Sequence, residues 1–155
     1  MQKVFHFDSP REKYRCDAAV IWCFDNRFHI VLNKFLKKLG IEHSDPIEIA
    51  GGAKCLATPD LESEREFVLE QIRKSMNLHS TRRVILMVHS DCGAYGGLEK
   101  FSGDRDAERV HHREELLRAS RSLAAAISGI AIDTYFVDFE GVWEPDLAAL
   151  AAAAG

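Results

Sequence analysis

The chain has 155 residues, of which 46% are hydrophobic and 28% are charged, and its formal net charge is −4 at pH 7. This length suits one domain with a buried core and is too short to predict two. The small negative charge gives no reason to expect nucleic acid or an anionic membrane as a partner, and no stretch of about 20 apolar residues is present to span a membrane.

Residues 1–17 are predicted to form an amino-terminal arm. They contain no apolar run long enough for a signal peptide, so we expect a cytoplasmic protein, in which thiols stay reduced. The cysteines are therefore expected to be metal ligands or buried thiols. Cys16 and Cys55 lie in no ligand-like context and are assigned to packing, which leaves Cys23 and Cys92 as candidate ligands.

The chain then alternates between continuous apolar runs, which predict strands, and apolar residues at helical spacing, which predict helices. Residues 18–24 are a continuous apolar run, which is typical of a buried strand. Apolar residues at helical spacing predict a helix over residues 28–39, and Gly40 is expected to end it. Residues 46–50 predict a short second strand.

A second helix and a third strand follow. Gly51-Gly52 predicts a turn, with close approach of the backbone to the site as the alternative. A helix is expected after Thr58-Pro59-Asp60, with Pro59 near its first turn. Residues 84–88 predict the third strand.

The last third of the chain repeats the alternation. Residues 107–127 predict a charged helix, in which His111-His112 is expected on a solvated face. Residues 130–138 predict a fourth strand, and residues 139–143 are expected to turn back or to extend the sheet. Residues 146–155 are alanine-rich and are expected to form a short terminal helix or a frayed end. Four glycines before the charged helix predict a flexible connection: Gly93, Gly96, Gly97 and Gly103.

These elements predict a single α/β domain over residues 1–155, with a mostly parallel sheet of strand order 2-1-3-4 flanked by helices. In this order the first and third strands are neighbours, and a crevice opens at their carboxyl ends. Cys23 ends the first strand and His89 ends the third, so the two side chains are expected to meet. Cys92 follows His89 by three residues, within reach of the same site.

Two thiolates and one imidazole are the ligands of a zinc ion that keeps its fourth position open. We therefore predict that Cys23, His89 and Cys92 bind Zn²⁺, which favours an enzyme that acts through metal-activated water. Asp25 is expected to orient that water. Arg27 is expected to hold Asp25 ionised through paired hydrogen bonds, although a purely structural ion pair is the alternative.

Two short motifs resemble those of the β-class carbonic anhydrases. That family has a Cys-x-Asp-x-Arg segment and a His-x-x-Cys-Gly segment, which correspond here to Cys23-Phe-Asp-Asn-Arg27 and His89-Ser-Asp-Cys-Gly93. An Ala-Gly pair lies between the two in the family and matches Ala50-Gly51. The resemblance covers residues 18–138 in the order of the elements.

The resemblance implies a zinc lyase in which a zinc-bound hydroxide attacks CO₂ to give bicarbonate. Cys23, His89 and Cys92 would be the zinc ligands, and Asp25 and Arg27 the orienting catalytic pair. It also implies a homodimer or a higher homo-oligomer, and a closed state in which Asp25 is a fourth zinc ligand. Gly51 and Gly93 are candidate substrate-binding positions.

Two alternatives remain open. The same hydroxide would attack the carbon of CS2 or COS, which predicts a hydrolase of a CO₂-like substrate. The other alternative is a non-catalytic zinc-binding protein of this fold. His29 is close enough in sequence to the first motif to be considered as a proton shuttle.

Overall fold

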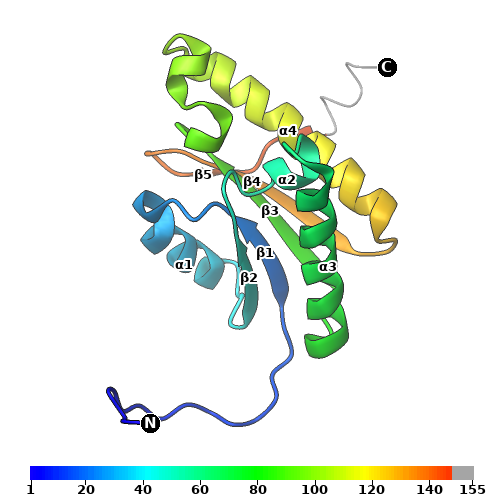
Figure 1. The fold of residues 1–155 in the computed structure, drawn as a ribbon. Helices are drawn as coiled ribbons and strands as arrows, with labels where there is room; N and C mark the ends of the chain where they lie inside the picture. The colour runs from blue at the N-terminus through cyan, green and yellow to red at the C-terminus, as the bar shows by residue number, and fades with distance from the viewer. Residues whose placement is uncertain (148–155) are drawn as a thin grey trace.

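The computed structural model describes residues 1–147, which form one five-stranded sheet with helices on both faces (Figure 1). The strand order is β2-β1-β3-β4-β5, in which the first four strands are parallel and β5 is antiparallel to β4. The predicted order 2-1-3-4 is thus confirmed, and residues 139–143 turn back to add an edge strand. The strands are β1 Ala18–Trp22, β2 Ser44–Glu48, β3 Arg83–His89, β4 Ala131–Val137 and β5 Val142–Trp143.

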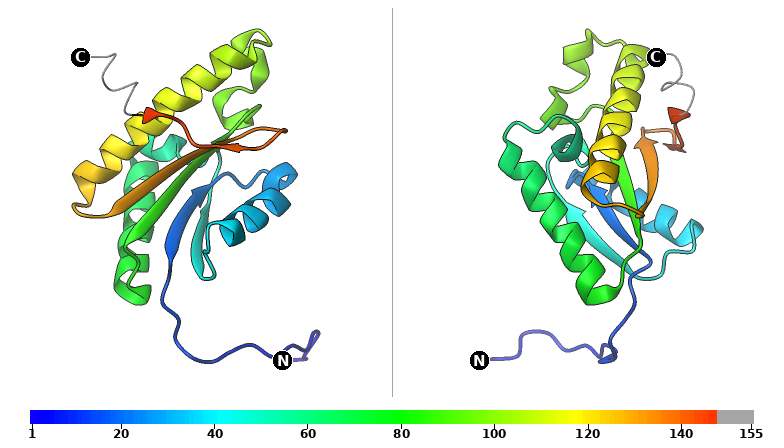
Figure 2. Two further views of the ribbon diagram at one scale, coloured as in Figure 1. Left: turned by 180° about the vertical axis from the view of Figure 1, so that it is seen from behind. Right: turned by 90° about the vertical axis from the view of Figure 1, so that its right-hand side faces the viewer.

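Helix α1 covers one face of the sheet, and α2, α3 and α4 cover the other (Figure 2). Three short 3₁₀ helices lie in the connections at the carboxyl end of the sheet. This is a single-domain α/β fold. The α-helices are α1 His29–Lys38, α2 Lys54–Ala57, α3 Glu62–His79 and α4 Arg105–Ala126, and the 3₁₀ helices are η1 Asn26–Phe28, η2 Gly93–Tyr95 and η3 Leu98–Phe101.

The apolar run in β1 is explained by its place in the sheet. Strand β1 lies between β2 and β3, and both of its faces are covered, so all five of its residues are buried. Ala19 and Ile21 pack with the helices α3 and α4, whereas Val20 and Trp22 pack with α1. Because alternate residues of a strand point to opposite faces, a strand covered on both sides needs apolar residues throughout.

Several predicted boundaries are wrong by a few residues. Strand β1 ends at Trp22, two residues before the predicted end; the Trp22 carbonyl accepts the amide of Ile49 as the last ladder bond with β2, and the chain turns into η1 after Asp25. Strand β2 begins at Ser44 and contains Pro46, which an edge strand tolerates. Pro59 lies before α3, whose first residue is Glu62, so it does not sit in the first turn.

The glycine-rich connection is more regular than predicted, because η2 and η3 lie within it. The prediction for the charged helix is also wrong in one respect. His112 is fully buried and His111 is half-buried, since this side of α4 packs on Tyr95 of η2 and on Phe136 of β4. Helix α4 therefore has polar side chains that face the interior, among them Glu108, His112 and Glu115, although its sequence is rich in charged residues.

The two ends of the chain differ in what the structure describes. Residues 1–15 are exposed and extend away from the sheet, and Cys16 is buried where the arm joins the domain (Figure 1). Of the predicted alanine-rich tail, residues 148–155 lie outside the described residues. No helix within residues 1–147 is long and apolar enough to cross a membrane.

Candidate metal centre

Cys23 and His89 meet because the strands that carry them are neighbours. Cys23 follows β1, His89 is the last residue of β3, and these strands pair in parallel. Cys92 returns to the same place through the turn at Asp91, whose backbone is left-handed with φ 52°. The three side chains therefore converge at the carboxyl ends of β1 and β3, as the sequence predicts.

The spacing of the three side chains fits one tetrahedral metal ion. Their ligand atoms all lie within 4.8 Å of one another, and the two sulfur atoms of Cys23 and Cys92 are 4.0 Å apart. Two thiolates on one tetrahedral zinc would lie about 3.8 Å apart. Among residues 1–147 this is the single set of three or more His, Cys, Asp and Glu side chains that meets this spacing.

The histidine is oriented to offer one lone pair to that position. His89 is 1% exposed, and its Nδ1–H donates to the Ser90 carbonyl at 2.8 Å. This bond fixes the proton on Nδ1, as is usual for a metal-ligating histidine. The other ring nitrogen, Nε2, is buried and has no hydrogen-bond partner among the described residues. A buried, unpaired nitrogen facing two thiols fits a metal ion.

The thiols of Cys23 and Cys92 contact each other, and each changes the pKa of the other. A hydrogen bond from the Cys92 thiol lowers the pKa of Cys23 to about 4, and smaller contributions come from His89 and from the backbone N–H of Gly51. The same contact with Cys23, together with burial, raises the pKa of Cys92. Cys23 is thus prepared as the first thiolate, and metal binding would displace the proton from the second.

The predicted ion pair between Asp25 and Arg27 is present. Nε of Arg27 lies 3.1 and 3.0 Å from the two carboxylate oxygens of Asp25, and Nη2 lies 2.7 Å from Oδ2. The side-chain hydrogen bond with Arg27 lowers the pKa of Asp25 to about 2. Oδ2 of Asp25 lies 3.9 Å from Nε2 of His89, so an ionised carboxylate stands next to the candidate metal position.

The sequence reasoning missed Asp91 as a partner in this arrangement. Arg27 also donates from Nη1 to Oδ2 of Asp91 and from Nη2 to its carbonyl, both at 2.9 Å. Asp91 lies inside the His-x-x-Cys motif. Position 91 has a left-handed backbone, which favours Asp, Asn or Gly. An Asp in this tight turn was therefore the available signal in the sequence.

The glycines near the centre have different surroundings. Gly51 has φ 75°, and its backbone N–H contributes to the lowered pKa of Cys23. At Gly52 a Cβ would lie 2.4 Å from the Met87 carbonyl, so the backbone passes closely over the end of β3. Gly93 is exposed and has open space around it. Substrate binding at Gly51 and Gly93 stays a prediction.

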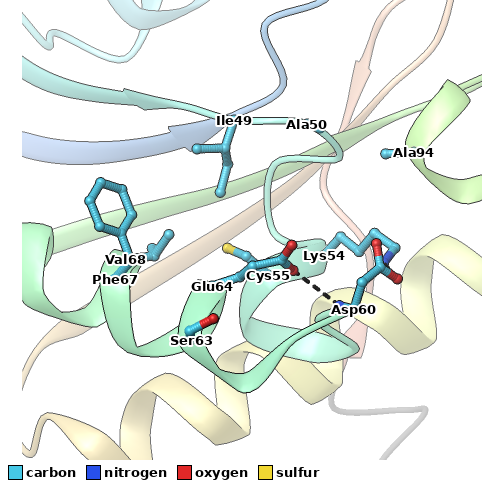
Figure 3. A pocket seen from close by; sticks show the side chains of 10 residues that line it. All are labelled: Ile49, Ala50, Lys54, Cys55, Asp60, Ser63, Glu64, Phe67, Val68 and Ala94. Atoms are coloured by element: carbon cyan, nitrogen blue, oxygen red, sulfur yellow. Dashed lines mark hydrogen bonds and ion pairs between the residues drawn. The ribbon is translucent and has the colours of Figure 1, made fainter.

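A cavity of about 350 Å³ lies beside the metal centre, between the end of β2 and the helices α2 and α3 (Figure 3). Its polar side chains are paired with one another: Lys54 contacts Asp60 at 2.6 Å, and Glu64 accepts the Asp60 amide at 3.0 Å. Ala50 and Ala94 border both the cavity and the glycines of the centre. The remaining lining is largely apolar: Ile49, Cys55, Ser63, Phe67 and Val68.

Within residues 1–147, no hydrogen bond or ion pair joins His29 to the candidate metal ligands. His29 lies on the exposed side of α1, where its Nε2 is 3.4 Å from the side-chain nitrogen Nδ2 of Asn33. Its predicted role in proton transfer stays a prediction. Cys16 and Cys55 are buried free thiols away from the metal centre, in agreement with their assignment to packing.

The fold and the site define the class. A mostly parallel sheet with two cysteines and one histidine converging at the ends of β1 and β3 is the architecture of a β-carbonic anhydrase-like protein. Residues 13–146 match the family model described as "Putative carbonic anhydrase", and the chain belongs to this family.

Individual relatives are distant. An uncharacterized protein of Rickettsia bellii is 25% identical over 130 residues, which are 82% of this chain and 79% of that protein. The β-carbonic anhydrase isoform I of Trichomonas vaginalis superposes with a TM-score of 0.58 at 14% identity, over 90% of this chain and 87% of that one. A carbon disulfide hydrolase in its apo form gives 0.56 at 16% identity, over 92% and 85%. At these identities the two solved structures show the fold alone.

Proposed function

We propose that this protein is a zinc-dependent enzyme that reversibly hydrates carbon dioxide to bicarbonate. The observation that carries the proposal is the convergence of Cys23, Cys92 and the unpaired Nε2 of His89, with the ionised Asp25 3.9 Å from that nitrogen. Zinc held there would lower the pKa of a coordinated water and so supply a nucleophile at neutral pH.

The residues of the chain divide the remaining tasks. Cys23, His89 and Cys92 hold the metal and leave its fourth position free. Asp25 accepts a hydrogen bond at that position and so fixes the direction of attack, while Arg27 keeps the carboxylate ionised. If Asp25 were released from Arg27, it would be a fourth ligand and would close the site. Gly51 and Gly93 would border the substrate.

CO₂ is small, carries no charge and forms weak hydrogen bonds. None of the candidate metal ligands lines the cavity bordered by Ala50 and Ala94, so such a substrate would react at the metal position and not in that cavity. CS2 and COS share these properties. The likeness to a carbon disulfide hydrolase therefore keeps hydrolysis of such a substrate as the second candidate function.

We extend the proposal to the assembly and location of the protein. Phe24 and Phe139, at the rim of the centre, are 65% and 61% exposed, which supports a homodimer or higher homo-oligomer that covers them. The four cysteines are free, and thiol ligands need a reducing compartment, which supports a cytoplasmic location. Light scattering on the zinc-loaded protein tests the assembly.

The decisive experiment is CO₂ hydration by the purified, zinc-loaded protein across pH, measured by stopped flow with a pH indicator. We expect turnover that rises with pH and disappears when a chelator removes the metal. Release of sulfide from CS2 by the same preparation separates the second candidate. Stoichiometric zinc without turnover of CO₂, CS2 or COS would establish the non-catalytic zinc-binding alternative.

A further inference from the structure

Asp91 occupies a constrained position between two candidate metal ligands. Its backbone has φ 52°, although it is not a glycine. Such conformations are uncommon outside glycine and persist where the surrounding structure fixes them. The loop from His89 to Cys92 is therefore held by specific contacts, and those contacts show what it does.

Every polar group of Asp91 is engaged. Its Oδ1 accepts the amide of Leu98 at 3.0 Å, and its Oδ2 and carbonyl oxygen accept the two terminal nitrogens of Arg27 at 2.9 Å each. Its own amide donates to Oε1 of Glu108 at 2.6 Å. One residue thus joins the loop, the guanidinium of Arg27 and helix α4.

Glu108 links this loop to the interior. It lies in the first turn of α4 and is 2% exposed, and His112, one turn further, is fully buried with Nε2 3.8 Å from Oε1. A buried carboxylate is costly unless it makes hydrogen bonds. The bond to the Asp91 amide is the contact through which Glu108 acts on the site.

Arg27 needs this support because it is 43% exposed. An exposed pair of arginine and aspartate is weak by itself, since a long side chain loses conformational freedom in one geometry. Asp25 holds Nε and Nη2, and Asp91 holds Nη1 and Nη2 from the other side. Two acceptors on opposite sides of a planar guanidinium fix its orientation.

We infer that Asp91 and Glu108 are positioning residues, which fix Arg27 and through it hold Asp25 beside the candidate metal centre. The consequence for catalysis rests on the proposed function, whereas the coupling of Glu108, Asp91 and Arg27 rests on their contacts. Asp91 and Glu108 would thus act on the site through Arg27 and through the backbone of the loop between His89 and Cys92.

The test is the rate at which the Nε–H of Arg27 exchanges with solvent, measured by nuclear magnetic resonance on the metal-free full chain. The signal is assigned by its loss in Arg27→Lys. Asp91→Asn tolerates the left-handed backbone and keeps an oxygen for Leu98, but it loses the charge that faces Arg27. We expect exchange to be about tenfold faster or more. An unchanged rate in Asp91→Asn would overturn the inference.

Asp138 offers a matched control. It also follows a strand, accepts an arginine at 2.8 Å from Nη2 of Arg109, and accepts the amides of Glu140 and Gly141 at 2.9 Å. Within residues 1–147 it makes no hydrogen bond or ion pair with Arg27, so Asp138→Asn should leave the exchange of the Arg27 Nε–H unchanged. Equal acceleration in both aspartate variants would show general loosening of the domain and would also overturn the inference.

A second pair of variants tests Glu108. Glu108→Gln keeps an oxygen for the Asp91 amide and should retain slow exchange, whereas Glu108→Met removes the acceptor and should accelerate it. If Glu108→Met does not fold, as shown by circular dichroism, Asp91→Asn still decides. Fast exchange in the glutamine variant and slow exchange in the folded methionine variant would contradict the assigned role.

Activity provides the third readout. In the zinc-loaded protein, Asp91→Asn should keep its zinc and its KM for CO₂ while kcat falls about tenfold, the usual size of an effect from residues that orient a metal site. If the wild type hydrates no CO₂, the proposed function fails, but the exchange rates still decide whether Asp91 and Glu108 fix Arg27. The two failures are therefore distinguishable.

Discussion

The two ends of the parallel sheet each hold a cluster of polar groups, but among residues 1–147 only the carboxyl-end cluster leaves a buried nitrogen facing two thiols. At the amino end, Asp45 accepts the Tyr14 hydroxyl at 2.7 Å, the Ser75 hydroxyl at 2.5 Å and Nδ1 of His79 at 2.8 Å. At the carboxyl end, Nε2 of His89 is buried and has no hydrogen-bond partner within residues 1–147. In the first cluster the carboxylate of Asp45 is paired with three neighbouring side chains. In the second, Nε2 of His89 would be paired only if a metal ion were bound.

This difference shows how to tell a structural cluster from a functional one. Both ends contain an aspartate with a cationic or imidazole partner and a buried cysteine, so residue types alone do not separate them. A polar network with all of its groups paired stabilises the fold, whereas an unpaired buried nitrogen needs a partner, and beside two thiols a metal ion would be that partner.

Metal binding should separate the two ends most strongly. We expect Cys23→Ser to lose nearly all of the one zinc per chain, because a serine hydroxyl does not replace a thiolate as a zinc ligand. Cys16→Ser, which changes a buried thiol at the amino end, should keep its zinc. Elemental analysis of protein purified without chelators measures both, and equal zinc in the two variants would remove the contrast.

Release of Asp25 should inactivate the carboxyl end. In Arg27→Ala the carboxylate is no longer clamped and is free to move onto the metal, so CO₂ hydration should be nearly abolished at neutral pH. Activity should recover as the pH rises, because hydroxide then competes better for the metal. Activity–pH profiles with X-ray absorption at the zinc edge test this, and a loss that is independent of pH would contradict it.

Asp25→Asn should have a smaller but still large effect. The three metal ligands remain, so zinc content should be nearly intact, while activity should fall about 10²-fold because the hydrogen-bond acceptor at the open position is lost. The matched substitution Asp45→Asn at the amino end should leave activity unchanged. If Asp25→Asn keeps full activity, the pair of Asp25 and Arg27 is structural.

The free energy of unfolding should fall more in Asp45→Asn than in Asp25→Asn, which is the reverse of their expected order for activity. Asp45→Asn weakens three charge-assisted hydrogen bonds in a position that is 16% exposed, and we expect a loss of about 2 kcal/mol in the free energy of unfolding. Asp25 is capped by an exposed arginine, so Asp25→Asn should cost less than half as much. Urea unfolding of both metal-free variants measures the difference, and a reversed order would contradict it.

The smallest effect concerns Tyr14 at high pH. The hydrogen bond to Asp45 raises the pKa of Tyr14 from 10.0 to about 12. Neutral Tyr14 therefore contributes stability that is fully present below about pH 10 and is lost as the pH rises through about 12. Phenolate absorbance should show one tyrosine that titrates late, and Tyr14→Phe should remove it. Ordinary titration of Tyr14 would show that the amino-end cluster is loose.

The sequence predicted much of this arrangement, for reasons that can be traced to particular residues. Buried parallel strands are continuously apolar, so the runs that became β1 and β3 were visible, and the order 2-1-3-4 follows from the alternation with helices. Strand ends were less certain. Strand β1 stops at Trp22, although the apolar run continues through Cys23 and Phe24, because its pairing with β2 ends there.

The sequence predicted only some of the residues of the candidate site. Cys23, His89 and Cys92 stood out because thiols and an imidazole after strands are distinctive. Glu108 and His112 did not, because both lie in a stretch of charged residues that resembles a solvated helix. Their burial depends on which side of α4 faces the sheet, and the irregular charge pattern of that helix does not specify the side.

The sequence by itself therefore determined the elements, their order and the chemical identity of the three candidate ligands, because these depend on local hydrophobic period and residue type. Only the tertiary structure decided that Nε2 of His89 is left unpaired, that Asp91 and Asp25 hold Arg27 from two sides, and that Glu108 reaches the loop from α4. These features join residues 27, 91 and 108, and contacts between distant segments arise from packing in three dimensions, which a local pattern does not encode.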